Sequence, residues 1–548
     1  MNIFQRNKLT NLFFFLIYGR NFKNLFINNS KKIFGTDKEN LVYKIRKSLL
    51  ELNLEKNIKI FDIKENQSNK FYNIKKSFHQ YLWVSFIHSD FFNMHLILSI
   101  AQNKSFFFPL PNNYIQDISK FIKVNFFLSK FLWKVILIIF LLFTLIKIFI
   151  SFFSFLKITK STNLIYCNSL ANIGSKNLNY TVFDNFFSWF SKKNDLKKNS
   201  IFLHENKEIK NYDEKNDYEI TIFSTKYKKN IDFFIFDFTD FLIYLRSFLE
   251  CFILLIKCLI KNDFDLIILL FDIFLFKLHL KSKKSYQYAL FNNSQMFYRP
   301  LWTYAQEYKK KSSTIFYFYS TNNDHLLHFI KNQEYIKFSP YPLFTWPNYI
   351  LWGMDHLNWL QKKSKSIINH YSIVDYIPFE GEDIQFPKNK LKRICIFDSF
   401  PRDDFTYFKL HSPYNIYDLK YCISFLEDIM DLLKNYNHLE IYLKTKRNNK
   451  NIHLSYLNHL TKMTEEYSNL KIIRGSYSAQ SIISNSDLCI SIPYTSTALI
   501  SNSLSVKSIF YDPSGKLPKD SNSFKLIELI NGKNKLEKCL IKYLKKTK

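Results

Sequence analysis

The chain has 548 residues, with 77 Lys and Arg against 46 Asp and Glu, and a formal net charge of +31. Two or three domains are expected at this length. The charge would suit nucleic acid, anionic lipid or an acidic glycan, but it is spread along the whole chain. No zinc-finger pattern and no aromatic RNA-binding motif accompanies it, so we expect no nucleic-acid partner.

The spacing of glycine and cysteine excludes several kinds of site. No two of the eight glycines fit G-x-G-x-x-G or G-x-x-x-x-G-K-[ST], which excludes dinucleotide-binding and Walker-type sites. The seven cysteines form no C-x-x-C pair, which indicates a reducing compartment without zinc. No small-residue cleavage site follows the apolar residues 11–18, so we expect a cytoplasmic protein without a signal peptide.

Residues 1–120 are predicted to form an N-terminal region of mixed α/β character, with a strand at 57–63. Residues 121–160 are predicted to contain a hydrophobic, membrane-associating helix, because the apolar run 135–155 reaches the ~20 residues that cross a bilayer. Lysines flank this run on both sides, so the positive-inside rule does not predict how a spanning helix would be oriented in the membrane. A spanning helix, a helix docked on the membrane surface and a buried core helix all remain open.

Residues 161–378 combine helical and strand patterns and are predicted to form a domain of their own. We expect helices at 246–261, 265–280 and 300–308, and strands at 232–238 and 314–319. The triplet Asp263-Phe264-Asp265 has the form of a D-x-D metal motif, but a helix N-cap is the simpler interpretation, so we expect no metal. Residues 379–390 contain Pro387 and Gly381 and are predicted to be a linker.

Residues 391–548 alternate strand and helix patterns. Strands are predicted at 393–398, 439–444, 470–474, 488–492 and 507–511, and helices at 416–436, 452–467, 478–484 and 495–504, with two further helices closing the domain. This alternation is typical of parallel βαβ units. Ligands bind beyond the carboxyl ends of the strands in such sheets.

Polar residues follow four of these strands and are the candidate site residues. They are Asp398, Arg402, Asp403 and Asp404 after the first strand, Lys444 and Lys446 after the second, Ser478 after the third, and Tyr494, Thr495, Ser496 and Thr497 after the fourth. The last group opens a helix, whose unpaired N–H groups and positive dipole end favour phosphate. Ser and Thr at this position also cap helices, so a purely structural cap is the alternative.

The run 492–498, IPYTSTA, resembles the signature of the bacterial polysaccharide biosynthesis PFTS-motif family, with Tyr494 in place of the usual Phe. Family-like stretches also occur at 299–302, 318–322, 349–353 and 396–401. The resemblance implies a GT-B-like α/β fold in which two Rossmann-like domains face a cleft, 161–378 for the acceptor and 391–548 for the nucleotide-sugar donor. It also implies work on a surface polysaccharide.

The layout is similar to that of bacterial sialyltransferase-type enzymes, in which a Ser/Thr pair at a helix start binds the nucleotide phosphate. By that analogy Ser496 and Thr497 would hold the donor phosphate. Those enzymes often have His-Pro after the second strand, whereas this chain has Lys444-Thr445-Lys446. The general acid of the analogy is therefore missing.

These observations predict a metal-independent glycosyltransferase without a cofactor, at the inner face of the cytoplasmic membrane. Its partners would be a nucleotide-sugar donor, a glycan acceptor, with a lipid-linked glycan as one option, and the membrane surface. Lys444 and Lys446 would share the donor phosphate, while Asn322 and Asn323 would contact the acceptor. The acid/base group is expected among Asp398, Asp403, Asp404 and Glu382. A non-catalytic assembly protein and a CDP-dependent phospho-polyol transferase are the alternatives.

Overall fold

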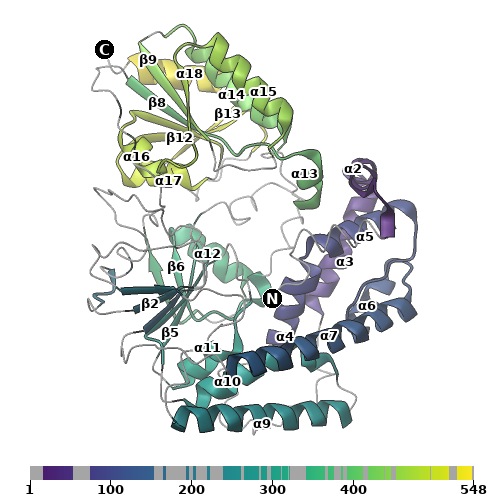
Figure 1. Ribbon diagram of the computed structural model, residues 1–548. Helices are drawn as coiled ribbons and strands as arrows, with labels where there is room; N and C mark the ends of the chain where they lie inside the picture. The colour runs from purple at the N-terminus through teal and green to yellow at the C-terminus, as the bar shows by residue number, and fades with distance from the viewer. Residues whose placement is uncertain are drawn as a thin grey trace.

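Two parallel sheets organise the chain (Figure 1). In the computed structural model the described residues are 17–52, 74–152, 164–167, 190, 193–196, 201–204, 219–222, 238–260, 264–282, 285–292, 298–309, 312–318, 320, 341–364, 368–374, 384, 386, 392–410, 418–436, 438–445, 452–493, 495–517 and 527–545. Every strand pairing that these residues form within the two sheets is parallel.

The first sheet has the order β3-β2-β1-β4-β5-β6-β7. Its strands are β1 Leu164–Cys167, β2 Ile201–His204, β3 Glu219–Ile222, β4 Tyr288–Asn292, β5 Ser313–Tyr317, β6 Asn348–Leu351 and β7 His370–Ile373. The second sheet has the order β10-β9-β8-β11-β12-β13. Its strands are β8 Lys392–Phe397, β9 Leu439–Lys444, β10 Leu470–Ile473, β11 Leu488–Ser491, β12 Lys507–Asp512 and β13 Glu528–Asn531.

Both sheets have the same strand connectivity. Counted along the chain within each sheet, the order is 3-2-1-4-5-6, with a seventh strand added to the first sheet. This is the doubly wound order of a Rossmann fold, and it reverses direction between the first and fourth strands, where ligands bind. In the second sheet that switch point lies between β8 and β11. The predicted α/β fold with two Rossmann-like sheets is therefore confirmed.

Helices cover both sheets and form an additional N-terminal region. Those before the first sheet are α2 Phe22–Ile33, α3 Asp37–Glu51, α4 Ile74–Leu82, η2 Trp83–Ile87, α5 Asp90–Gln102, α6 Asn112–Ser119 and α7 Phe126–Phe152. Those within the first domain are α9 Phe238–Ile260, η3 Phe264–Leu269, α10 Leu270–Lys281, α11 Leu301–Tyr308, η6 Tyr341–Leu343 and α12 Met354–Lys363. The C-terminal helices are α13 Asp404–Leu410, α14 Leu419–Leu433, α15 Leu454–Glu466, α16 Ala479–Ser484, α17 Ser496–Ser503 and α18 Lys533–Lys545.

The C-terminal elements form where the apolar pattern predicts them, because each central strand is buried on both faces. All four residues of β11 and the last four of β8 are buried. Asp418 caps α14 by accepting a hydrogen bond from the backbone N–H of Tyr421. The prediction of two closing helices is wrong in part, since Glu528–Asn531 is the edge strand β13 and α18 follows it.

Several N-terminal predictions concern residues outside the described ranges, among them the strand at 57–63 and most of the strand at 232–238. Phe238 itself begins α9 and is helical. Residues 135–152 of the apolar run belong to α7, which begins earlier, at Phe126, and residues 153–155 lie outside the described ranges. Within the described ranges one helix, Phe126–Phe149, is long and apolar enough to cross a membrane, but only 22% of its apolar window is buried. Of the three alternatives left open for this run, the wholly buried core helix does not fit this exposure.

Aromatic packing joins the C-terminal domain to the N-terminal helices. Phe405 of α13 packs against Phe22 and Phe26 of α2, with ring centroids 6.1 and 5.8 Å apart. The ring centroid of Phe34 lies 5.1 Å from that of Phe408. Lys31 also pairs with Asp404 at 2.9 Å. The C-terminal sheet is thus held by α2 as well as by the chain that connects the domains.

Candidate active site

The carboxyl ends of four neighbouring C-terminal strands lie at one edge of their sheet. Phe397 of β8 is in register with Lys444 of β9 on one side and Ser491 of β11 on the other, and Lys444 is in register with Ile473 of β10. Asp398 directly follows β8, so it emerges between the carboxyl ends of β9 and β11. Figure 1 shows α16 and α17, which follow β10 and β11, on the side of this domain nearest the N-terminal sheet.

The helix α17 begins directly at this edge, and a chain of hydroxyl groups precedes it. Thr495 occupies the N-cap position, but its side chain accepts no hydrogen bond from a backbone N–H of the first turn of the helix. Its Oγ1 instead donates to the backbone carbonyl of Ile492 at 3.0 Å. The side-chain cap, which was the alternative to a phosphate site, is therefore not formed by Thr495.

The direction of the hydroxyl chain follows from counting protons. Oγ1 of Thr495 lies 3.0 Å from Oγ1 of Thr497, which lies 3.0 Å from Oγ of Ser491. Because a hydroxyl has one proton and Thr495 gives its own to Ile492, Thr497 donates to Thr495 and Ser491 donates to Thr497. The protons of all three hydroxyls are used inside the protein, so Thr497 must rotate out of this chain before it can donate to a bound phosphate.

Lys444 and Ser478 lie at the adjoining strand ends. The Nζ of Lys444 is half-buried at the end of β9 and lies 3.5 Å from the carbonyl oxygen of Gly475 and 3.4 Å from that of Thr445. Ser478 is buried and caps α16 by accepting from the backbone N–H of Ser481 at 3.4 Å. Lys444 therefore places a cation at the edge where α17 begins, whereas Ser478 has a structural contact.

Each of the three described candidate carboxylates has a different environment. Asp398 is buried and accepts a hydrogen bond from the hydroxyl of Tyr456. Burial, and then the charge of Asp398, raise the pKa of Tyr456 well above its ordinary value, so this phenol stays protonated as the donor. Asp403 caps α13 by accepting from the backbone N–H of Thr406 at 2.9 Å, and Asp404 pairs with Lys31.

Phe400 is a feature that the sequence did not reveal. It is buried two residues after Asp398 and has φ +55°, the left-handed region that bulky residues rarely occupy. Its ring packs edge-on against Tyr456 at 5.5 Å, so the strained turn and the tyrosine that donates to Asp398 support each other. Strain of this kind is concentrated at functional sites. Arg402 follows in the same loop, and its backbone bridges to Ile452 after β9.

The remaining candidates are less informative. Glu382, Lys446, Tyr494, Asn322 and Asn323 lie outside the described residues. Asp265 of the D-x-D triplet accepts a hydrogen bond from Trp133 Nε1 at 2.7 Å. Within the described ranges no three His, Cys, Asp or Glu side chains are grouped as metal ligands would be.

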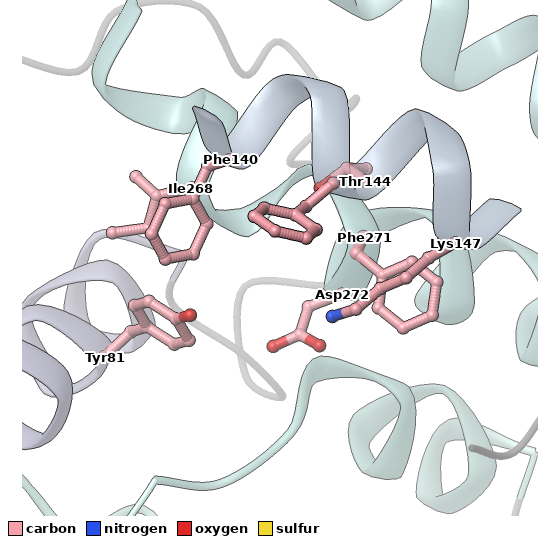
Figure 2. Close-up of a pocket in the computed structure, with 8 residues that line it drawn as sticks. Tyr81, Phe140, Thr144, Lys147, Ile268, Phe271 and Asp272 are labelled. Carbon is pink, nitrogen blue, oxygen red and sulfur yellow. The ribbon is translucent and has the colours of Figure 1, made fainter. Parts of the chain in front are cut away.

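A separate cavity lies in the other half of the molecule. It has a volume of ≈ 80 Å³ and is lined by Tyr81, Phe140, Phe143, Thr144, Lys147, Ile268, Phe271 and Asp272 (Figure 2). These residues come from α4, α7, η3 and α10, so the cavity is distinct from the strand ends of the second sheet. Its walls are mainly apolar, with one lysine and one carboxylate.

The chain contains two doubly wound parallel sheets, and the second sheet has a helix N-terminus and a lysine at the carboxyl-end edge of its strands. This architecture defines a GT-B-like protein. The comparison of its sequence with known families is more specific. Residues 255–540 match the model of the polysaccharide biosynthesis PFTS motif proteins, and the chain belongs to that family. No curated protein matches the chain by sequence.

The solved structures that match the chain are distant in sequence and have low TM-scores. A UDP-N-acetylglucosamine 2-epimerase described as putative, from Listeria monocytogenes, is 7% identical, with a TM-score of 0.34 over 70% of this chain and 88% of its own. Anabaena Alr3699/HepE in complex with UDP and glucose is 8% identical, with a TM-score of 0.36 over 70% and 90%. The β-Kdo 2,4-transferase KpsC of Thermosulfurimonas dismutans is 16% identical, with a TM-score of 0.17 over 28% and 40%.

Proposed function

We propose that the protein is a glycosyltransferase of surface polysaccharide biosynthesis, acting on capsule, lipopolysaccharide or exopolysaccharide. It transfers a sugar from a nucleotide-activated donor to a glycan acceptor. Family membership supports the polysaccharide role. The observation that carries the transferase role is the start of α17 at the edge where Lys444 ends β9, Ser491 ends β11 and Asp398 directly follows β8.

The donor phosphate binds at the start of α17. The first-turn N–H groups and the helix dipole attract the anion, and the side chain of Thr495 does not occupy them. Ser496 and Thr497 complete the site with their hydroxyls, and Lys444 adds the positive charge from β9. Lys446 and Tyr494, beside these residues in the chain, belong to the same proposed site, as do Arg402 and Ser478.

Transfer breaks the bond between the anomeric carbon and the donor phosphate oxygen and forms a bond from that carbon to an acceptor hydroxyl oxygen. The leaving phosphate gains negative charge, which α17 and Lys444 stabilise, so the proposal requires no metal. The acceptor proton passes to a carboxylate, for which Asp398, Asp403, Asp404 and Glu382 are the candidates. Asp398 is first among them, because it emerges between the chain ends of β9 and β11.

The N-terminal domain holds the acceptor, with Asn322 and Asn323 as its proposed contacts. A lipid-linked glycan is the acceptor class that suits a protein working at the inner face of the cytoplasmic membrane. This location is part of the proposal, and it is consistent with the exposed apolar surface of α7.

Thermal unfolding measured with UDP-, GDP-, CDP- and CMP-sugars tests the donor site, since selective binding stabilises the folded state. We expect one nucleotide class to raise the unfolding temperature, and Ser496→Ala with Thr497→Ala to remove that increase. Ser503→Ala, in the last turn of the same helix, is the matched control and should retain it. If no nucleotide sugar stabilises the wild-type protein, the donor site proposed here is refuted.

Two alternatives predict other results in the same titration. A non-catalytic assembly protein would bind glycan without any nucleotide response, and the engagement of all three hydroxyl protons inside the protein favours it. A phospho-polyol transferase would respond to CDP-activated donors alone and release CMP.

A further inference from the structure

The helix α7 has two faces, although nearly all of its side chains are apolar. One face packs against the protein along the whole helix. Ser129 accepts from the backbone N–H of Phe108 at 3.2 Å, Trp133 donates to Asp265, and the carbonyl of Ile148 accepts from the Tyr244 hydroxyl. The opposite face is exposed and consists of Phe127, Phe131, Ile138, Leu142, Ile146 and Phe149. Within each set the residues recur at helical spacing, mostly every three or four positions, so each set lies on its own side of the helix.

The helix α9 repeats this arrangement. Tyr244, Ser247, Cys251, Leu255 and Cys258 are buried, whereas Leu245, Leu249, Phe252, Ile253, Ile256 and Ile260 are exposed, Ile260 to 75%. Both helices pack on the η3–α10 segment. They are joined by the hydrogen bond from Tyr244 to Ile148. Figure 1 shows both helices lying across the end of the molecule that is remote from the C-terminal sheet.

The one lysine in the apolar part of α7 lies on its protein-facing side. Figure 2 shows Lys147 directed toward Asp272 and away from the outer surface of the helix, and its Nζ lies 4.9 Å from the centroid of Phe271. The cavity that it lines therefore keeps this charge away from the exposed face. Lys130 and Lys134 near the start of α7, and Arg246 and Lys257 of α9, are exposed.

We propose that α7 and α9 together form a monotopic docking surface that lies in the plane of a bilayer rich in anionic lipid. The exposed apolar side chains enter the boundary between head groups and acyl chains, and the four basic side chains contact anionic head groups. The surface does not span the membrane, because crossing would strip α7 of the contacts at Ser129, Trp133 and Ile148 and would place Lys147 in hydrocarbon.

Charge identifies the lipid surface, not a second copy of the chain, as the occupant. A protein of net charge +31 repels its own copy, whereas the same charge attracts anionic head groups. The docking surface deepens the membrane location proposed above and rests on no part of the donor site, so failed vesicle binding would remove that location and leave the proposed sugar transfer to its own test.

Flotation of the purified full chain with preformed vesicles tests the surface. We expect binding to phosphatidylcholine vesicles to become stronger when phosphatidylglycerol is added. Ile138→Glu with Leu142→Glu on α7, and separately Ile253→Glu with Ile256→Glu on α9, should each weaken partitioning by at least about 100-fold, since each inserted apolar side chain corresponds to roughly a tenfold change. Leu454→Glu with Leu457→Glu on α15 replaces two exposed leucines elsewhere and should change nothing.

The α9 variant separates docking from spanning. A spanning α7 would keep the protein on the membrane when α9 is altered, so full binding by that variant overturns the proposal. Circular dichroism confirms that each variant is folded, which is expected because all the substituted side chains are exposed. The wild-type protein could instead fail to bind vesicles and form dimers that dissociate in the α7 and α9 variants. That result would show that the surface is a self-association interface and would also refute the proposal.

Discussion

The hydroxyl chain at the start of α17 predicts a specific energetic effect of Thr497→Val. Valine has nearly the shape of threonine but has no hydroxyl, so Ser491, which is 0% exposed, loses its acceptor and Thr495 loses its donor. Leaving such buried groups unpaired costs about 1–3 kcal/mol of stability. Thr497→Ser keeps the hydroxyl and should cost less than about 1 kcal/mol.

Coupling between the two positions gives the sharper test. In a double-mutant cycle, Ser491→Ala and Thr497→Val should show an interaction energy of about 1 kcal/mol, since either change already breaks their hydrogen bond. Hydrogen exchange of amides in β11 and α17 is a suitable measurement, because all seven tryptophans precede the C-terminal sheet and their fluorescence would not report on it. Additive effects of the two substitutions would refute the hydrogen bond between Ser491 and Thr497.

Three further predictions concern charged groups. Lys444→Met should reduce sugar transfer by about 100-fold with a smaller loss of donor affinity, because the leaving phosphate gains charge. Lys434→Met, at the exposed C-cap of α14, should leave the transfer rate and the donor affinity equal to wild type. Partial burial raises the pKa of Glu250, but its hydrogen bonds and ion pairs with Lys281 and Lys277 together outweigh this and lower the pKa to about 2. Thermal stability should therefore fall as the pH drops from about 4.5 toward 2, and Glu250→Gln should flatten that fall. Arg299→Met should destabilise the first domain by about 3–5 kcal/mol in urea unfolding, because it removes a buried guanidinium and leaves partly buried Glu307 without its partner; no loss of stability would show that the pair is dispensable.

The C-terminal domain was predictable because its strands are short apolar runs separated by clear helical patterns. Leu439–Lys444 was predicted with the bounds that the structure has, and α17 within one residue at each end. β13 was not predicted, because its edge position leaves Glu528 exposed and gives Glu528–Asn531 no continuous apolar pattern. β1, β2 and β3 have four residues each, too few for a periodicity to emerge from the long segments between them.

The chemistry of the candidate site was only partly predictable. Lys444 and the start of α17 could be placed at one edge, because parallel strands bring their carboxyl ends together. The left-handed backbone of Phe400 could not, since nothing in its residue type favours that conformation. The role of Asp403 as a helix cap is a local contact with Thr406, three residues on, which the residue type permits but does not distinguish from a role in catalysis. The inward direction of the hydroxyl protons depends on the conformation of the turn before α17, which the residue types alone do not determine.

The contact between α13 and α2 has a mechanical consequence. Phe405 packs against α2, and α2 in turn packs against α5, so the loop after β8 is anchored to the N-terminal helices as well as to its own sheet. A hinge rotation that separated the two sheets would have to carry α2 along or break the Phe405 contacts and the Lys31–Asp404 pair. Because Asp398 and Phe400 lie in that loop and Asp404 begins α13, opening the domains would pull directly on the segment that carries the candidate carboxylates.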